Sequence, residues 1–351
     1  GLPSANDRAY MPHSMLGRLF KKTAVQRPLD TARVPDGMRV YAIGDIHGHA
    51  APLKALLAKL GYEQQRGVWR HPERQVIFLG DFIDRGPAQV EVVQIARGMV
   101  ETGAALAVMG NHEFNAVAWS RADDEKPGQF LRPHTQSKRK QHEAFLRQFG
   151  EGSAAYHDAL DWFRTLPLYF DLPGLRVVHA CWHEHSLAVL APFLDERGAI
   201  KPDAWSVLAR KGTDGFDALE TVLKGMEIPL PGGAWFADKD GQPRYHARLR
   251  WWHQLRGEHP LTWHDLAMLP GDQIEKIPHT PAPEDLIPGY HSDKPVFVGH
   301  YWMRGKPEPL APKVACLDYS IAAEHPDKLV AYRWDGEQEI CGESFVWVDG
   351  D

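Results

Sequence analysis

The sequence predicts an α/β fold that begins with parallel strands, and two observations support this prediction. Short apolar runs at residues 38–43, 75–79 and 105–109 are typical of strands, and a glycine directly follows each run. Between them, residues 52–60 and 88–102 carry apolar side chains at helical spacing. This β-α-β-α-β order joins parallel strands through right-handed crossovers.

Polar motifs follow the three strands. They read GDIHG at residues 44–48, GDFIDRG at 80–86 and GNHE at 110–113. Each opens with a glycine, which permits a tight turn. Because ligands bind at the carboxyl ends of parallel strands, we expect the three motifs to lie together.

The remaining strands deliver two further motifs. Residues 119–165 are typical of polar helices, with an exposed basic helix face at Lys138-Arg139-Lys140. A strand pair then leads to His179-Ala180, and a later strand leads to Gly299-His300. The last three strands of the chain suggest a second sheet packed on the first. The expected strands are 168–171, 175–179, 295–298, 314–318, 329–334 and 344–348.

The domain organisation follows from composition along the chain. Residues 1–37 are basic and aperiodic, and we expect an N-terminal arm that is partly an expression remnant, with Met15 a plausible native start. Residues 38–351 then form one domain. A tryptophan-rich insert with little periodicity interrupts it at about residues 183–294.

The bulk composition excludes several classes of partner. The chain has 351 residues, of which 43% are hydrophobic and 25% charged, with a net charge of -6. A mildly acidic chain has no global attraction to nucleic acid or to anionic membranes, and no apolar run is long enough for a membrane span. Three scattered cysteines predict no disulfide framework, so we expect buried thiols and a cytoplasmic protein without a signal peptide.

The residue types in the motifs predict a pair of metal ions. Asp45 and His47 lie two residues apart on one turn, and the Asp81 carboxylate has two oxygens with which to bridge two ions. Mixed nitrogen and oxygen ligands suit Mn²⁺ best here, with Fe or Zn as alternatives. Two ions roughly 3.5–4 Å apart clamp an in-line displacement at phosphorus and activate a bridging water. The expected ligands are Asp45, His47, Asp81, Asn111, His179 and His300.

Other motif residues supply the remaining catalytic roles. The Arg85 guanidinium can form bidentate hydrogen bonds with two phosphoryl oxygens. His112 follows Asn111 and can protonate a leaving alkoxide. Asp84 is the expected partner of His112, since a carboxylate raises the pKa of an imidazole. Glu113 is expected to orient the same loop.

In this order the motifs resemble those of the phosphoprotein-phosphatase (PPP) branch of the calcineurin-like metallophosphoesterases, which read GDxHG, GDxxDRG, GNHE, HA and GH. The resemblance covers about residues 38–119, 168–182 and 295–320. It implies an αββα sandwich of two mixed sheets flanked by helices, with two metal ions at the sheet edges. It also implies attack on phosphorus by a metal-bridging hydroxide, with His112 as the acid. Cys181-Trp182 and Tyr301 depart from the family pattern.

The resemblance leaves the substrate open. We rank a PPP-type phosphatase first, acting on phosphoserine or phosphothreonine in proteins or on small phosphomonoesters. A hydrolase of diadenosine tetraphosphate or related nucleotides is the alternative. A non-catalytic metal-binding scaffold is the rival from another class, and we expect no nucleic-acid or membrane partner.

The insert contains further candidate functional residues. His183-Glu184-His185 is interpreted as a solvated loop rather than a metal site. Most of the insert's tryptophans are expected to pack in the core, although Trp251-Trp252 could stack on a base beside Arg248 and Arg250. Because relatives use a second arginine on phosphate, Arg250 is assigned that role.

Overall fold

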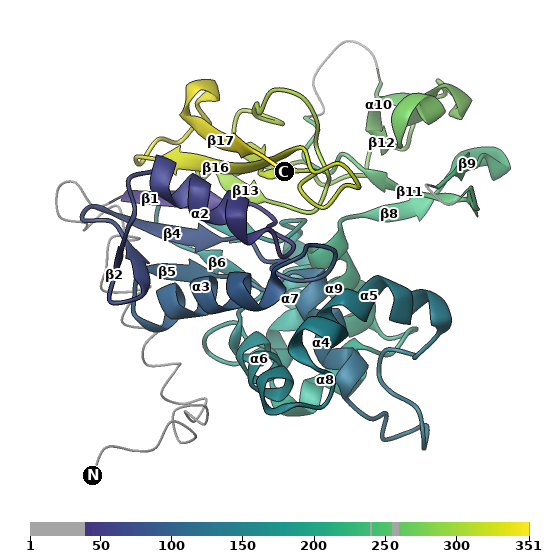
Figure 1. Cartoon of the computed structure of the whole chain (residues 1–351). Coiled ribbons are helices and arrows are strands. Elements are labelled where there is room, and N and C mark those ends of the chain that lie inside the picture. The colour runs from purple at the N-terminus through teal and green to yellow at the C-terminus, as the bar shows by residue number, and fades with distance from the viewer. Residues whose placement is uncertain (1–38, 239–240, 255–259, 351) are drawn as a thin grey trace.

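Two β-sheets stacked against each other form the centre of the computed structural model, which describes residues 39–238, 241–254 and 260–350 (Figure 1). The first sheet has the strand order β15-β16-β1-β4-β5, with β17 paired to β16, and the second has the order β14-β13-β7-β6. The strands are β1 Arg39–Ile43, β4 Arg74–Phe78, β5 Ala105–Ala107, β6 Tyr169–Asp171, β7 Arg176–Val178, β13 Val296–Val298, β14 Val314–Cys316, β15 Asp318–Tyr319, β16 Lys328–Trp334 and β17 Phe345–Asp349.

The predicted β-α-β-α-β start is confirmed. Strand β1 pairs in parallel with β4, and β4 pairs in parallel with β5. The crossovers are α2 (Ala50–Lys59) and α3 (Gln89–Glu101), which cover one face of the sheet (Figure 1). Helix α2 forms because Leu53, Leu56 and Leu57 make one apolar stripe, and each is fully buried.

The second sheet is composed differently from the prediction. The three C-terminal strands do not form a sheet of their own. Strands β15, β16 and β17 extend the first sheet through the antiparallel pairing of β16 with β1. Only β14 joins β13 and β7, in parallel. The two sheets still pack face to face, since the ring of Phe297 on β13 lies 4.9 Å from that of Tyr332 on β16.

The helices after β5 begin earlier than expected and are interrupted. Helix α4 (Asn111–Ser120) starts inside the GNHE motif. Residues 121–135 contain no helix, and α5 (Gln136–Phe149) and α6 (Ala154–Thr165) follow. Residues 138–140 lie on α5, where Arg139 and Lys140 are exposed, as predicted.

The insert is more regular than its sequence suggested. Its first half forms α7 (Glu184–Leu190), α8 (Trp205–Leu208) and α9 (Asp214–Lys224), whose apolar side chains join the main core. Its second half carries two small apolar clusters of its own. The elements there are β8 Glu227–Pro229, β9 Phe236–Ala237, β10 Pro243–Arg244, β11 His246–Leu249, α10 Trp263–Leu266 and β12 Ala267–Met268.

The structure tests the predictions about the N-terminal arm, membrane helices and cysteines only within the described residues. The expected N-terminal arm, residues 1–37, lies outside them. Within the described part, no helix combines the length and the apolar character that crossing a membrane requires. Cys181 and Cys316 are buried, as expected, but Cys341 is exposed, so that part of the cysteine prediction was wrong.

Candidate metal centre

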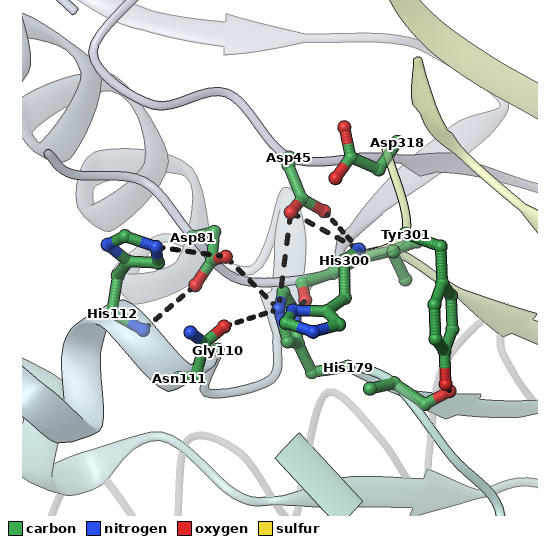
Figure 2. Close-up of polar contacts among 12 residues, drawn as sticks. Asp45, Asp81, Gly110, Asn111, His112, His179, His300, Tyr301 and Asp318 are labelled. Atoms are coloured by element: carbon green, nitrogen blue, oxygen red, sulfur yellow. Dashed lines mark hydrogen bonds and ion pairs between the residues drawn. The ribbon is translucent and has the colours of Figure 1, made fainter. Parts of the chain in front are cut away.

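The five motifs meet at one edge of the stacked sheets (Figure 2). Asp45 and His47 follow β1, Asp81 follows β4, and Asn111 begins the helix after β5. From the second sheet, His179 follows β7 and His300 follows β13. Both sheets therefore contribute side chains to a single site.

Unusual backbone conformations place these side chains. Five of the eight non-glycine residues with positive φ in the described chain belong to the motifs, and such conformations concentrate at functional sites. Glycines make the close packing possible. A Cβ atom on Gly110 would collide with the Asp81 carboxylate, and one on Gly299 would collide with the Asp45 carboxylate. The five residues are His47, Asp81, Asp84, Arg85 and His300.

Asp81 lies at the junction of two groups of potential ligands. His47, Asp81 and His112 form one group, and Asp81, His179 and His300 form the other. Within each group the ligand atoms lie within 4.8 Å of one another. The Asp81 Oδ2 atom is 3.1 Å from His179 Nε2 and 3.5 Å from His47 Nε2.

Asp45 and Asn111 complete the cluster. Asp45 Oδ2 lies 3.7 Å from His47 Nε2 and 4.0 Å from His179 Nε2. The Asn111 Oδ1 atom is 3.1 Å from His179 Nε2. With metal–ligand bonds of roughly 2.0–2.2 Å, atoms spaced in this way can share an ion. The structure thus brings all six predicted ligands to one point.

The imidazoles are oriented as metal ligands would be. The Nδ1–H of His47 donates to the Ile83 carbonyl at 2.7 Å, and that of His179 donates to the Leu79 carbonyl at 2.6 Å. These bonds turn both Nε2 atoms toward the carboxylates. His47 Nε2 is buried and has no hydrogen-bond partner among the described residues. Since buried polar atoms are rarely left unpaired, this atom fits a metal ligand.

The electrostatics of the cluster also fit a cation. Burial, together with the neighbouring Asp318 carboxyl, raises the pKa of Asp45 well above its usual range. Burial lowers the pKa of His179, but Asp81 and Asp45 outweigh it and raise that pKa to about 10. A metal ion bound here would stabilise the charged form of Asp45 and would replace the proton on His179.

Asp84 joins two histidines rather than one. Its Oδ2 accepts from His112 Nδ1 at 2.6 Å, and its Oδ1 accepts from His142 Nδ1 at 2.7 Å. Burial alone would raise the pKa of Asp84, but these two hydrogen bonds outweigh it, and the pKa is lowered. His142 lies on α5, stacked against Phe145. No sequence motif marks His142, so it was not among the predicted site residues.

Glu113 ties two of the loops together, which accords with its expected role. Its carboxylate accepts from the backbone N–H groups of Asp81 at 2.7 Å, Gly110 at 2.9 Å and Phe82 at 3.0 Å. The second and third motifs are therefore held together by one fully buried side chain.

Arg85 is exposed and packs on an aromatic ring. Its guanidinium carbon lies 4.9 Å from the centroid of the Trp302 ring, a cation–π contact that limits where the side chain can point. Trp302 and Asp318 were not among the predicted site residues. The Asp318 carboxyl hydrogen-bonds with Asp45 and accepts from the Trp302 backbone N–H at 3.3 Å, so it supports the first motif from β15.

The predictions about the insert have mixed outcomes. Trp251 and Trp252 are 0% and 3% exposed, so they pack in the core, as expected for most of its tryptophans, and they are not free to stack on a base. His183 caps α7 by accepting from the Ser186 N–H at 3.1 Å, and Glu184 begins that helix. The segment from 183 to 185 is thus a helix start, not a loop.

Comparisons with known proteins agree with this site. The family model described as calcineurin-like phosphoesterase matches residues 38–191. The bis(5'-nucleosyl)-tetraphosphatase PrpE (asymmetrical) of Oceanobacillus iheyensis is 30% identical over 42% of this chain and 58% of its own. The symmetrical bis(5'-nucleosyl)-tetraphosphatase of Aromatoleum aromaticum is 27% identical over 59% of this chain and 73% of its own.

Several solved structures align over more of the chain at lower identity. A protein serine/threonine phosphatase from Saccharomyces cerevisiae aligns over 97% of this chain and 91% of its own, with 14% identity and a TM-score of 0.48. A putative diadenosine tetraphosphatase aligns over 91% and 96%, with 16% identity and a TM-score of 0.44. The motifs and the family match show a calcineurin-like phosphoesterase domain over residues 38–191.

Proposed function

We propose that this protein is a dinuclear metal-dependent phosphoester hydrolase of the PPP type. One observation carries the proposal: the Oδ2 atom of Asp81 lies 3.5 Å from His47 Nε2 and 3.1 Å from His179 Nε2, so this carboxylate could serve two ions. Two ions held there would act as Lewis acids toward water and the phosphoryl oxygens. The mixed nitrogen and oxygen donors favour Mn²⁺, with Fe or Zn as alternatives.

The chain's own residues would position the phosphate and move a proton. The Arg85 fork binds two phosphoryl oxygens. The Nε2–H of His112 donates its proton to the departing alkoxide, and Asp84 holds the opposite ring nitrogen at 2.6 Å. Asn111, an expected metal ligand, would also bind the substrate through its side-chain amide.

A second arginine is proposed for the phosphate, and Arg248 is a candidate beside Arg250. The pKa of His300 is lowered by burial, by His179 and by the charge of Arg248. Arg248 is held by the Gly225 carbonyl at 3.0 Å and by Glu227 at 3.3 Å. Burial lowers the pKa of Arg250. Replacing Arg248 with methionine should raise KM more than the same change at Arg250.

For the substrate we propose phosphomonoesters first, either phosphoserine and phosphothreonine in proteins or small molecules. The burial of Trp251 and Trp252 removes the stacking argument for a nucleotide. The names of the relatives from Oceanobacillus and Aromatoleum support the alternative, a dinucleoside tetraphosphate. A cytoplasmic location remains part of the proposal.

The proposal is tested by activity and metal content together. Purified protein with Mn²⁺ should hydrolyse p-nitrophenyl phosphate, and EDTA should stop the reaction. Asp81→Asn should lose both metal and activity. A protein that binds two metal ions but turns over no phosphoester would be the non-catalytic scaffold.

Paired rates then decide the substrate class. A phosphothreonine peptide and diadenosine tetraphosphate are compared by kcat/KM under the same conditions. A higher value for the peptide supports the first choice, and a higher value for the nucleotide reverses the order.

A further inference from the structure

A second cluster of metal-ligating side chains lies in the insert. His264, Glu275 and His279 have ligand atoms that all lie within 4.8 Å of one another. His264 is on α10, Glu275 is in the 3₁₀ turn Gly271–Lys276, and His279 follows that turn. Figure 1 shows α10 and β12 at the margin of the molecule. None of these residues belongs to the five motifs.

One atom of the cluster needs a partner. The Nε2 atom of His264 is buried and makes no hydrogen bond to any residue that the structure describes. A buried imidazole nitrogen without a partner loses hydration without compensation, which proteins usually avoid. The neighbouring Asp265 does not satisfy it, because its Oδ2 already accepts from Thr262 N and Oγ1 at 2.8 and 2.9 Å.

The two histidines are also closely packed. Their ring centroids lie 4.0 Å apart with an interplanar angle of 21°. Imidazoles are common ligands of divalent metal ions, and this stacking brings two of them to one place. Glu275 and His279 are exposed, which leaves water free to complete the coordination.

The surrounding structure would gain from a metal ion. Two separate clusters supply the local core, with five and four buried apolar residues. Such small cores supply little stability, and metal ions often compensate for this in small units. An ion bound by His264, Glu275 and His279 would link α10 to the 3₁₀ turn and to the segment that follows it.

We propose that His264, Glu275 and His279 bind a borderline divalent cation, with Zn²⁺ the best match to two imidazoles and one carboxylate. Three protein ligands leave one position for water. The site lies apart from Asp81 and its neighbours, and its role is to stabilise the outer half of the insert. It does not depend on the proposed phosphoesterase activity.

Zinc stoichiometry tests the proposal. Asp81→Asn provides a background with a weakened catalytic centre. In that background, Glu275→Gln and His264→Gln should each weaken zinc binding by more than about tenfold, as measured by calorimetry. His246→Gln, an exposed histidine on β11 outside the cluster, is the matched control and should change nothing. Glu275 is exposed, so its variant should fold even if the His264 variant does not.

A second readout locates the ion. Zn²⁺ should slow proteolysis between residues 264 and 295 in the Asp81→Asn protein but not in its Glu275→Gln derivative. Equal zinc affinity in Asp81→Asn with and without Glu275→Gln would overturn the proposal. Equal proteolysis with and without zinc would overturn the stabilising role.

Discussion

At the scale of single residues, the unexpected finding is that Asp84 holds two histidines. His112 faces the metal ligands, whereas His142 is buried and bonds Asp84 through its Nδ1 atom. A carboxylate pinned at both oxygens has less freedom to turn away from His112. His142 is therefore a positioning residue for the proposed acid.

A double-mutant cycle separates this role from a general structural one. His112→Asn should keep its metal and lose about 10²–10⁴ in kcat. His142→Gln should lower kcat less, without changing KM. In the His112→Asn background, His142→Gln should have no further effect on kcat, since the group it positions is gone. Additive losses in kcat would contradict the assignment.

The charge of Asp84 also makes stability depend on pH. Its folded pKa lies below the ordinary value of 3.8, so its contribution is present above about pH 4. The contribution is lost as the pH falls further toward the lowered folded value. Asp84→Asn should thus cost about 1–3 kcal/mol at pH 7.

Chemical denaturation across a pH series checks this prediction. The difference in unfolding free energy between the wild type and Asp84→Asn should shrink below about pH 4. A difference that stays constant from pH 7 to pH 2.5 would show that the charge is not responsible.

At the scale of elements, the strand-end loops depend on glycines that let carboxylates approach the backbone. Gly299 follows β13, and a Cβ atom there would meet Asp45 Oδ1. Gly299→Ala should displace that carboxylate and reduce metal content and activity by about tenfold or more, as a change to a ligand's support does.

The matched control is Gly98→Ala. Gly98 lies inside α3, where an added Cβ meets no atom within 4 Å. Alanine is a better helix former than glycine, so this variant should keep its metal and unfold at the same or a higher temperature. Metal analysis and thermal unfolding of both variants test the argument. Full metal content in Gly299→Ala would refute it.

At the scale of the whole molecule, the metal centre connects the two sheets. Asp45, His47, Asp81 and Asn111 come from the first sheet, whereas His179 and His300 come from the second. An ion bound by both sheets stabilises only the folded arrangement. Binding should therefore appear as thermal stability.

Mn²⁺ should raise the Tm in a concentration-dependent way. At a hundred times Kd the gain is about 2.7 kcal/mol, which corresponds to a shift of several degrees in a chain of this size. Asp81→Asn should show little of this shift. A scanning calorimetry series with and without Mn²⁺ measures it, and an equal shift in the variant would place the stabilising ion elsewhere.

Local sequence determined the parallel start of the first sheet and the residues of the five motifs. In segments such as residues 39–48 and 74–86, a short apolar run is followed by glycine and polar side chains. This pattern is typical of a buried strand that ends in a tight turn. The helix α9 could also have been predicted, because Ala218, Leu219, Val222 and Leu223 recur at helical spacing behind the cap Thr213.

Only the tertiary structure decided which residues support the motifs. His142, Trp302 and Asp318 lie 58, 217 and 273 residues from their partners Asp84, Arg85 and Asp45, and nothing in their local sequence marks those contacts. The pairing of β16 with β1, and the burial of Trp251 and Trp252, depend on packing between distant segments. Local sequence sets conformational preference and residue chemistry, whereas the partner that satisfies each side chain is chosen when the whole core forms.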